Sequence, residues 1–197
     1  TEYISEHFKK KNGMLIYNEK LSVCPLTTHL PIKHVAKKIS KKLISEKIDL
    51  IDNFFKKVLK IKAKIAVTGL NPHCESVSKY NEDEKIIPQI INEKISKGID
   101  IKGPYPADTV FLKKNRKQFN IILGMYHDQV LGPLKALYEY DAFNITMGLP
   151  ILRISPDHGP NQNMFGKNKS NPKSLIKALK FLDKRWLKQK KVLAKIS

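Results

Sequence analysis

Apolar residues in the first third of the chain form short continuous runs and then recur at helical spacing. Two apolar runs, at residues 14–17 and 21–26, flank polar residues 18–20, and this arrangement predicts a pair of strands. Residues 32–61 place apolar side chains three and four apart with Lys on the opposite face, which predicts a helix. We expect this helix to break near Ser40.

The rest of the chain continues the alternation of apolar runs with helical segments. Further strands are predicted at residues 65–68, 119–125, 143–147 and 151–154. Further helices are predicted at residues 82–97, 129–138 and 171–193. Asn171 and Pro172 suit the N-cap and the first position of the last helix, which is long and amphipathic. Strands that alternate with helices predict an α/β fold with helices packed on the faces of a sheet.

The charge of the chain is strongly basic, with 37 Lys and Arg against 18 Asp and Glu and a net charge of +19. Such a charge is typical of nucleic-acid binding. However, only Arg116, Arg153 and Arg185 are Arg, and recognition of phosphates and bases favours Arg. The Lys residues are spread along every predicted helix, which indicates solvated faces. We therefore expect no nucleic-acid partner.

The composition is that of a globular protein, with 41% hydrophobic and 28% charged residues. No apolar run approaches the roughly 20 residues that a transmembrane helix needs. Cys24 and Cys74 are too few to form a disulfide framework, and neither belongs to a CxxC pair. We therefore expect a cytoplasmic protein that does not bind a membrane.

Three histidines each follow a predicted strand. His29 follows the second apolar run, His73 follows the strand at 65–68, and His127 follows the strand at 119–125. Ligands of open α/β sheets bind beyond the carboxyl ends of the strands, where such loops meet. Three neutral imidazoles there suit Zn²⁺ or a similar divalent ion. The spacing is equally consistent with three ordinary loop or core histidines.

Two aspartates lie close to these histidines in the sequence. Asp128 directly follows His127, and Asp108 lies in the segment GPYPADT at 103–109. Either carboxylate could orient a histidine or carry a proton. Asp108 could equally be the N-cap of a short helix.

Further polar residues follow His127. Lys135 comes one to two helical turns later, and Asn144 and Arg153 lie on or at the ends of the next two strands. A guanidinium group suits a carboxylate or phosphate, because it can bind both oxygens at once. His158 belongs to a turn at 155–159, where a turn role and a ligand role are both open. The sequence has no GxGxxG motif, P-loop or nucleophile elbow.

Seven motifs occur in order along nearly the whole chain. They are TEY at 1–3, TTHLP at 27–31, GLNPH at 69–73, GPYPADT at 103–109, MYHDQ at 125–129, NITMGLP at 144–150 and RISPDHG at 153–159. Together they resemble the 4-hydroxythreonine-4-phosphate dehydrogenase family of pyridoxal phosphate biosynthesis. The resemblance implies a three-layer α/β/α domain of the isocitrate and isopropylmalate dehydrogenase type, with the family's N-terminal domain largely missing.

The resemblance also implies a reaction. Family members oxidise 4-phosphooxy-L-threonine with NAD or NADP to 2-amino-3-oxo-4-phosphooxybutanoate, which loses CO₂ to give 3-amino-2-oxopropyl phosphate. It implies a homodimer in which His29, His73 and His127, drawn from both subunits, hold a divalent ion at the interface. Zn, Mg and Co are the candidate ions. Such an ion would polarise the substrate hydroxyl.

The family's other site positions can be matched to residues of this chain. Thr1, Lys135, Asn144 and Arg153 match substrate-binding positions. Asp157, His158 and Gly159 resemble the loop that holds the adenosine side of NAD. We expect catalytic roles for Asp108, Asp128 and Lys135. The sequence departs from the family after His73, where CESVS replaces a Gly-containing loop, and after Gly159, where Pro160 and Asn161 replace Thr-Ala.

The expected organisation has two parts. Residues 1–170 would form the metal- and substrate-binding domain with the dimer interface, and residues 171–197 a helix that packs on the missing N-terminal domain. Two alternatives to the main function remain open. One is a related dehydrogenase of a phosphorylated sugar acid, such as 4-phosphoerythronate or phosphothreonate, and the other is a metal-binding dimerisation fragment without catalysis.

Overall fold

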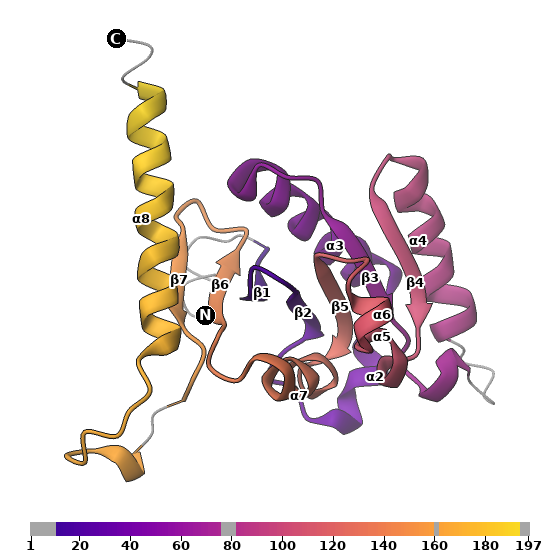
Figure 1. The fold of residues 1–197 in the computed structure, drawn as a ribbon. Helices are drawn as coiled ribbons and strands as arrows, with labels where there is room; N and C mark the ends of the chain where they lie inside the picture. Colours follow the sequence, from indigo (N-terminus) through magenta and orange to yellow (C-terminus); the bar gives the residue numbers. More distant parts are fainter. Residues whose placement is uncertain (1–10, 76–81, 160–161, 194–197) are drawn as a thin grey trace.

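The computed structural model describes residues 11–75, 82–159 and 162–193, and side chains up to residue 185. The strands in these ranges form one sheet of seven strands with the order β4-β3-β5-β2-β1-β6-β7 (Figure 1). Their bounds are β1 Gly13–Tyr17, β2 Ser22–Thr27, β3 Lys64–Thr68, β4 Asp100–Tyr105, β5 Ile121–Tyr126, β6 Phe143–Met147 and β7 Arg153–Pro156.

The sheet has a parallel half and an antiparallel half. Strands β4, β3, β5 and β2 are parallel to one another, whereas β1, β6 and β7 pair antiparallel with their neighbours. The carboxyl ends of the four parallel strands, at Thr27, Thr68, Tyr105 and Tyr126, therefore share one edge of the sheet. We call this edge the carboxyl edge.

Helices cover both faces of the sheet. The helices and single turns are η1 Ile32–His34, α2 Val35–Lys38, α3 Lys41–Phe54, η2 Phe55–Leu59, η3 Pro72–Cys74, η4 Glu82–Ile86, α4 Ile87–Ser96, α5 Ala107–Val110, α6 Lys113–Arg116, α7 His127–Tyr138, η5 Gln162–Met164 and α8 Lys173–Leu193. Residues of α3 and α4 pack in one core with Leu123 of β5, and residues of α5 and α7 pack in a second core with Ile122. Adjacent residues of β5 thus face opposite layers, which confirms the three-layer arrangement.

Most of the predicted elements are present. The strand pair at the start is β1 and β2, and the helical segment at 32–61 divides at Ser40, whose hydroxyl accepts a hydrogen bond from Leu43 N as an N-cap. Strand β4 was not predicted, because Ile101 is its only buried residue and its pattern does not alternate. The short helix α6 was not predicted, and a short helix near Asp108, where α5 lies, was considered only as an alternative role for that residue.

The first half of α8 packs on the antiparallel half of the sheet. The Phe181 ring lies 5.1 Å from Tyr17 and 5.3 Å from Phe143, between ring centroids. The buried hydroxyl of Ser174 donates to Ala142 O and accepts from Asp157 N. The apolar residues of the outer face are exposed: Leu175, Ile176, Leu179 and Leu182. That α8 also packs on a further domain stays a prediction.

Among the described residues, no helix combines the length and the hydropathy needed to cross a bilayer.

Candidate functional site

Two of the three predicted metal ligands lie side by side at the carboxyl edge. His29 comes two residues after β2, and His127 is the first residue of α7, directly after β5. Because β2 and β5 are parallel neighbours with Thr27 opposite Tyr126, the two histidines leave the sheet together. Their ring centroids are 6.3 Å apart. One divalent ion can be reached by two imidazoles at this separation, so the pair fits the donor set of a metal site.

A carboxylate fixes the orientation of one of these rings. Asp128 Oδ1 lies 2.6 Å from His127 Nδ1, and the His127 side chain is 35% exposed. A carboxylate at Nδ1 directs the Nε2 lone pair outward, which is the arrangement that metal-binding histidines commonly have. The orienting role considered for Asp128 stays a prediction.

The third predicted ligand lies on a loop of the same edge. His73 belongs to η3, after β3, and its side chain is exposed. In the described ranges no three His, Cys, Asp or Glu side chains are close enough together to hold a metal ion. A single chain therefore brings His29 and His127 together and places His73 on the same edge without completing a three-residue site.

A buried carboxamide joins the loops that carry His73 and His127. Gln129 Oε1 accepts hydrogen bonds from Thr68 Oγ1 at 2.8 Å and Met125 N at 2.7 Å, and Gln129 Nε2 donates to Gly69 O at 2.8 Å. The end of β3, the end of β5 and the start of α7 are thereby held together. We did not predict this role, although Gln129 stands at the end of the MYHDQ motif.

A second buried side chain, the carboxylate of Asp83, holds the loop of residues 69–74, which carries His73 and is called the His73 loop below. Asp83 of η4 is 1% exposed. Its Oδ1 accepts from Leu70 N at 2.5 Å, and its Oδ2 accepts from Asn71 N at 3.1 Å and Asn71 Nδ2 at 2.7 Å. The sequence pattern placed Asp83 in a helix and indicated nothing more.

Asp108 also lies at the carboxyl edge. It occupies the first turn of α5, but the N-cap of that helix is Pro106, so the capping alternative for Asp108 is wrong. Burial raises the pKa of the Cys74 thiol, and the charges of Asp83, Asp108 and Glu75 raise it further. Asp108 therefore lies on the same edge of the sheet as His73, without a hydrogen bond described between them.

The predicted substrate and cofactor residues lie on α7, β6 and β7 and in the turn after β7, and two of them, Lys135 and Asp157, are in contact. Lys135, in the last turn of α7, places its Nζ 2.5 Å from the Asp157 carboxylate and donates to Asp157 O at 2.6 Å. Arg153, the first residue of β7, donates to Thr146 Oγ1 at 2.9 Å. The buried Asn144 Oδ1 has no hydrogen-bond partner within the described ranges.

The remaining predicted positions are less defined by contacts. His158 and Gly159 lie in an exposed turn after β7, with His158 Nδ1 3.2 Å from Gly159 O. Thr1 falls outside the described residues.

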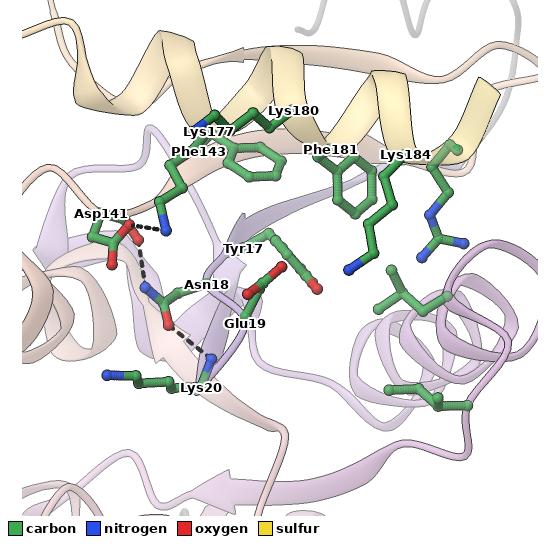
Figure 2. Close-up of a pocket in the computed structure, with 13 residues that line it drawn as sticks. Tyr17, Asn18, Glu19, Lys20, Asp141, Phe143, Lys177, Lys180, Phe181 and Lys184 are labelled. Carbon is green, nitrogen blue, oxygen red and sulfur yellow. Dashed lines mark hydrogen bonds and ion pairs between the residues drawn. The ribbon is translucent and has the colours of Figure 1, made fainter. Parts of the chain in front are cut away.

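Two cavities are formed by other residues. One, of about 560 Å³, lies under α8 beside the amino end of β2, opposite the carboxyl edge. Figure 2 shows Lys177 directed toward Asp141, 2.9 Å away, and Lys184 directed toward Tyr17 and Glu19. The second, of about 480 Å³, lies between α3 and the loop from β6 to β7. None of the predicted site residues lines either cavity. We therefore place the candidate site at His29 and His127, whose imidazoles can bind a metal ion.

A comparison with family profiles identifies the chain. The profile described as "Pyridoxal phosphate biosynthetic protein PdxA" matches residues 1–182. The chain belongs to the PdxA family. This confirms the resemblance carried by the seven motifs.

Named relatives agree with this assignment. The chain is 43% identical over 183 residues to the 4-hydroxythreonine-4-phosphate dehydrogenase of Sulfurihydrogenibium sp., covering 91% of this chain and 56% of the relative. It is 36% identical over 169 residues to the D-threonate 4-phosphate dehydrogenase of Salmonella typhimurium, covering 85% of this chain and 52% of the relative. The chain thus spans about half the length of these relatives.

Solved structures of PdxA proteins share the fold. The crystal structure of 4-hydroxythreonine-4-phosphate dehydrogenase from Klebsiella pneumoniae superposes with a TM-score of 0.77 at 31% identity, covering 91% of this chain and 56% of that one. This neighbour confirms the α/β fold of the isocitrate and isopropylmalate dehydrogenase type. A terephthalate dihydrodiol dehydrogenase from Burkholderia xenovorans, at 20% identity and a TM-score of 0.66, shares the fold alone.

Proposed function

We propose that this chain forms the metal- and substrate-binding part of an NAD- or NADP-dependent dehydrogenase of a 4-phosphorylated hydroxy acid. The observation that carries the proposal is the pair of His29 and His127 at the carboxyl edge, with Asp128 fixing the His127 ring. In open α/β sheets this edge is where ligands bind. Membership of the PdxA family supports the reaction class.

The substrate that we propose is 4-phosphooxy-L-threonine. Its oxidation would give 2-amino-3-oxo-4-phosphooxybutanoate, a β-keto acid that decarboxylates to 3-amino-2-oxopropyl phosphate. D-threonate 4-phosphate is a second candidate, because a relative at 36% identity is named for it. The two substrates share the phosphate and the neighbouring hydroxyl group and differ at C2.

The divalent ion would be held by His29, His73 and His127. Two of these side chains are adjacent in one chain, and His73 is exposed on the same edge, so a homodimer could supply the third ligand across its interface. Zn²⁺, Mg²⁺ and Co²⁺ are all candidates. When bound, the ion would act as a Lewis acid that polarises the substrate hydroxyl and stabilises the developing alkoxide.

The other site residues would bind and orient the reactants. Arg153 and Lys135 would hold the phosphate or carboxylate, and the orphaned Asn144 Oδ1 would accept a hydrogen bond from a substrate donor. The turn at Asp157, His158 and Gly159 would contact the adenosine side of the dinucleotide. Asp108 and Asp128, with Lys135, are the groups that we expect to orient the histidines or carry a proton.

The metal site is tested by replacing its exposed ligand. We expect the purified protein to retain one Zn²⁺ per chain and the His73→Ala variant to lose it, because two imidazoles hold the ion weakly. Metal content measured by mass spectrometry after dialysis provides the readout. His34→Ala, which removes an exposed histidine from η1, is the control and should keep its metal. Unchanged metal in His73→Ala would contradict the proposed site.

The substrate class is tested by binding. Isothermal titration in the presence of Zn²⁺ should detect 4-phosphooxy-L-threonine but not L-threonine, because the phosphate supplies most of the charged hydrogen bonds. Arg153→Ala should weaken binding about 10- to 100-fold, the range for a lost charge-assisted hydrogen bond. Arg116→Ala, an exchange of an arginine on α6, should leave binding unchanged. Equal affinity for L-threonine would exclude a phosphorylated substrate.

A further inference from the structure

The loop that carries His73 is held by its backbone. Gly69 N donates to Tyr105 O at 3.0 Å, and Gly69 O accepts from Gln129. The next two amides, Leu70 N and Asn71 N, both donate to Asp83. Three consecutive residues before η3 are thus fixed by hydrogen bonds to β4, α7 and η4.

The conformation of this loop needs such support. His73 has a φ of 59° and Cys74 a φ of 60°, which places two consecutive residues with side chains in the left-handed region. Residues other than glycine rarely adopt this region and keep it only where the surroundings over-determine it. The imidazole of His73 is directed by that backbone, so its placement depends on what fixes the loop.

The side chain of Asp83 is suited to hold the loop in this conformation. Its carboxylate is almost fully buried, and a buried charge is tolerated only when its oxygens are hydrogen-bonded. All three of its hydrogen bonds described above come from the His73 loop. A Cβ added at Gly69 would lie 2.7 Å from Asp83 Oδ1, so glycine at this position allows the carboxylate to approach the loop.

We propose that Asp83 is a positioning residue, whose buried carboxylate holds the loop of residues 69–74 so that His73 is presented at the carboxyl edge. The role in metal binding rests on the proposed function. The hold on the loop does not, because it follows from the hydrogen bonds of Asp83 alone.

The reactivity of Cys74 can report on this loop in the absence of a metal ion, and Cys24 can serve as an internal control. Cys74 directly follows His73 and is partly exposed, whereas Cys24 in β2 is completely buried. Burial raises the pKa of Cys24 to about 11. Iodoacetamide reacts with thiolates that it can reach, so at pH 8 it should alkylate Cys74 and spare Cys24. Each rate is measured by peptide mass spectrometry.

The deciding variant is Asp83→Asn, which keeps the shape of the side chain but removes acceptor capacity. We expect Cys74 to be alkylated about 10- to 100-fold faster, because charge-assisted hydrogen bonds to the loop are lost. Cys24 should stay protected. Zn²⁺ affinity, measured by titration, should fall about 10- to 100-fold, as it does when residues that orient metal ligands are changed.

The control variant is Glu75→Gln. It removes another carboxylate that raises the pKa of Cys74, and none of the loop hydrogen bonds described above involves the Glu75 side chain. It should therefore change the alkylation rate much less than Asp83→Asn, and equal effects of Asp83→Asn and Glu75→Gln would overturn the proposal. Because the charge of Asp83 raises the pKa of Cys74 more than that of Glu75 does, a variant that changes no charge is also needed to separate lost hydrogen bonds from lost charge. Faster alkylation of Cys24 would overturn it too, since that result indicates global unfolding.

A second variant approaches the same contact from the loop. Asn71→Ala removes the donor of one of the three hydrogen bonds to Asp83, so it should accelerate Cys74 alkylation in the same direction by a smaller factor. An unchanged rate in both Asp83→Asn and Asn71→Ala would overturn the proposal. If wild-type protein binds no Zn²⁺ but Asp83→Asn still releases Cys74, the hold on the loop is supported and the metal site is rejected.

Discussion

Gln129 illustrates how single buried polar residues define the carboxyl edge. Its carboxamide makes three hydrogen bonds, to groups from β3, from β5 and from the loop that follows β3. Two of the partners belong to Thr68 and Met125, which are completely buried. The position of His127, two residues earlier in the chain, is coupled to this network.

We expect Gln129→Ala to reduce the free energy of unfolding by about 3 kcal/mol or more, since each buried polar group left unpaired costs about 1–3 kcal/mol. Urea denaturation followed by circular dichroism measures the change. Gln118→Ala, at an exposed position before β5, should change stability by less than about 0.5 kcal/mol. A Gln129→Ala variant as stable as the Gln118 control would show that water replaces the lost hydrogen bonds.

The candidate site was predictable where a local rule applies. His29 and His127 follow strands, and the rule that such loops meet at one edge brought them together correctly. Asp83 and Gln129 were not predicted, because their hydrogen bonds join residues far apart in the chain. Nor could the sequence indicate that His73 belongs to no group of three metal-binding side chains among the described residues, because that depends on loop conformation.

At the scale of elements, α8 docks through few side chains. Phe181 is the main buried anchor, against Tyr17 and Phe143, and Arg185 lies over the Phe181 ring with its guanidinium carbon 5.0 Å from the centroid. Ser174 fixes the first turn of the helix to the ends of β6 and β7. Lys177 adds an ion pair with Asp141, at 2.9 Å.

Phe181→Ala should therefore release α8 from the sheet, because removing a buried Phe costs about 3–5 kcal/mol. Hydrogen–deuterium exchange should show faster amide exchange in α8, with β2, β3 and β5 unchanged. Leu182→Ala, on the exposed face of the same helix, should leave exchange as it is. If both variants exchange alike, the helix is held by other contacts.

Elements with strong periodicity were predictable and their arrangement was not. Helix α3 and strand β5 have clear patterns because each buries one or two apolar faces. Strand β4 is flanked by only one neighbour and buries only Ile101, so no pattern marks it. The mixed sheet order depends on long-range pairing, which local periodicity does not encode.

At the scale of the whole molecule, the net charge of +19 is expected to lower the stability of the fold. Like charges distributed over a compact surface repel one another, and salt shortens the range of that repulsion. Ion pairs such as Lys11 with Glu46 are exposed and offset little of it.

We therefore expect the urea midpoint to rise when NaCl is increased from about 20 mM to about 200 mM, a change that shortens the Debye length roughly threefold. Intrinsic fluorescence or circular dichroism can follow the transition. As the control, a variant with fewer lysines should show a smaller rise of the urea midpoint over the same range of NaCl. A midpoint that falls with NaCl would show that favourable ion pairs outweigh the repulsion.

The strand order also determines when the sheet can form. Ser22 of β2 pairs with Ile121 of β5, and Gly13 of β1 pairs with Met147 of β6. Strands near the start of the chain therefore pair with strands that the ribosome synthesises much later. Until β5 is available, β2 and β3 lack the strand that lies between them in the sheet. Closing such long loops slows folding relative to chains with local contacts. During synthesis, the interval before residue 147 emerges is when this chain most needs protection from aggregation.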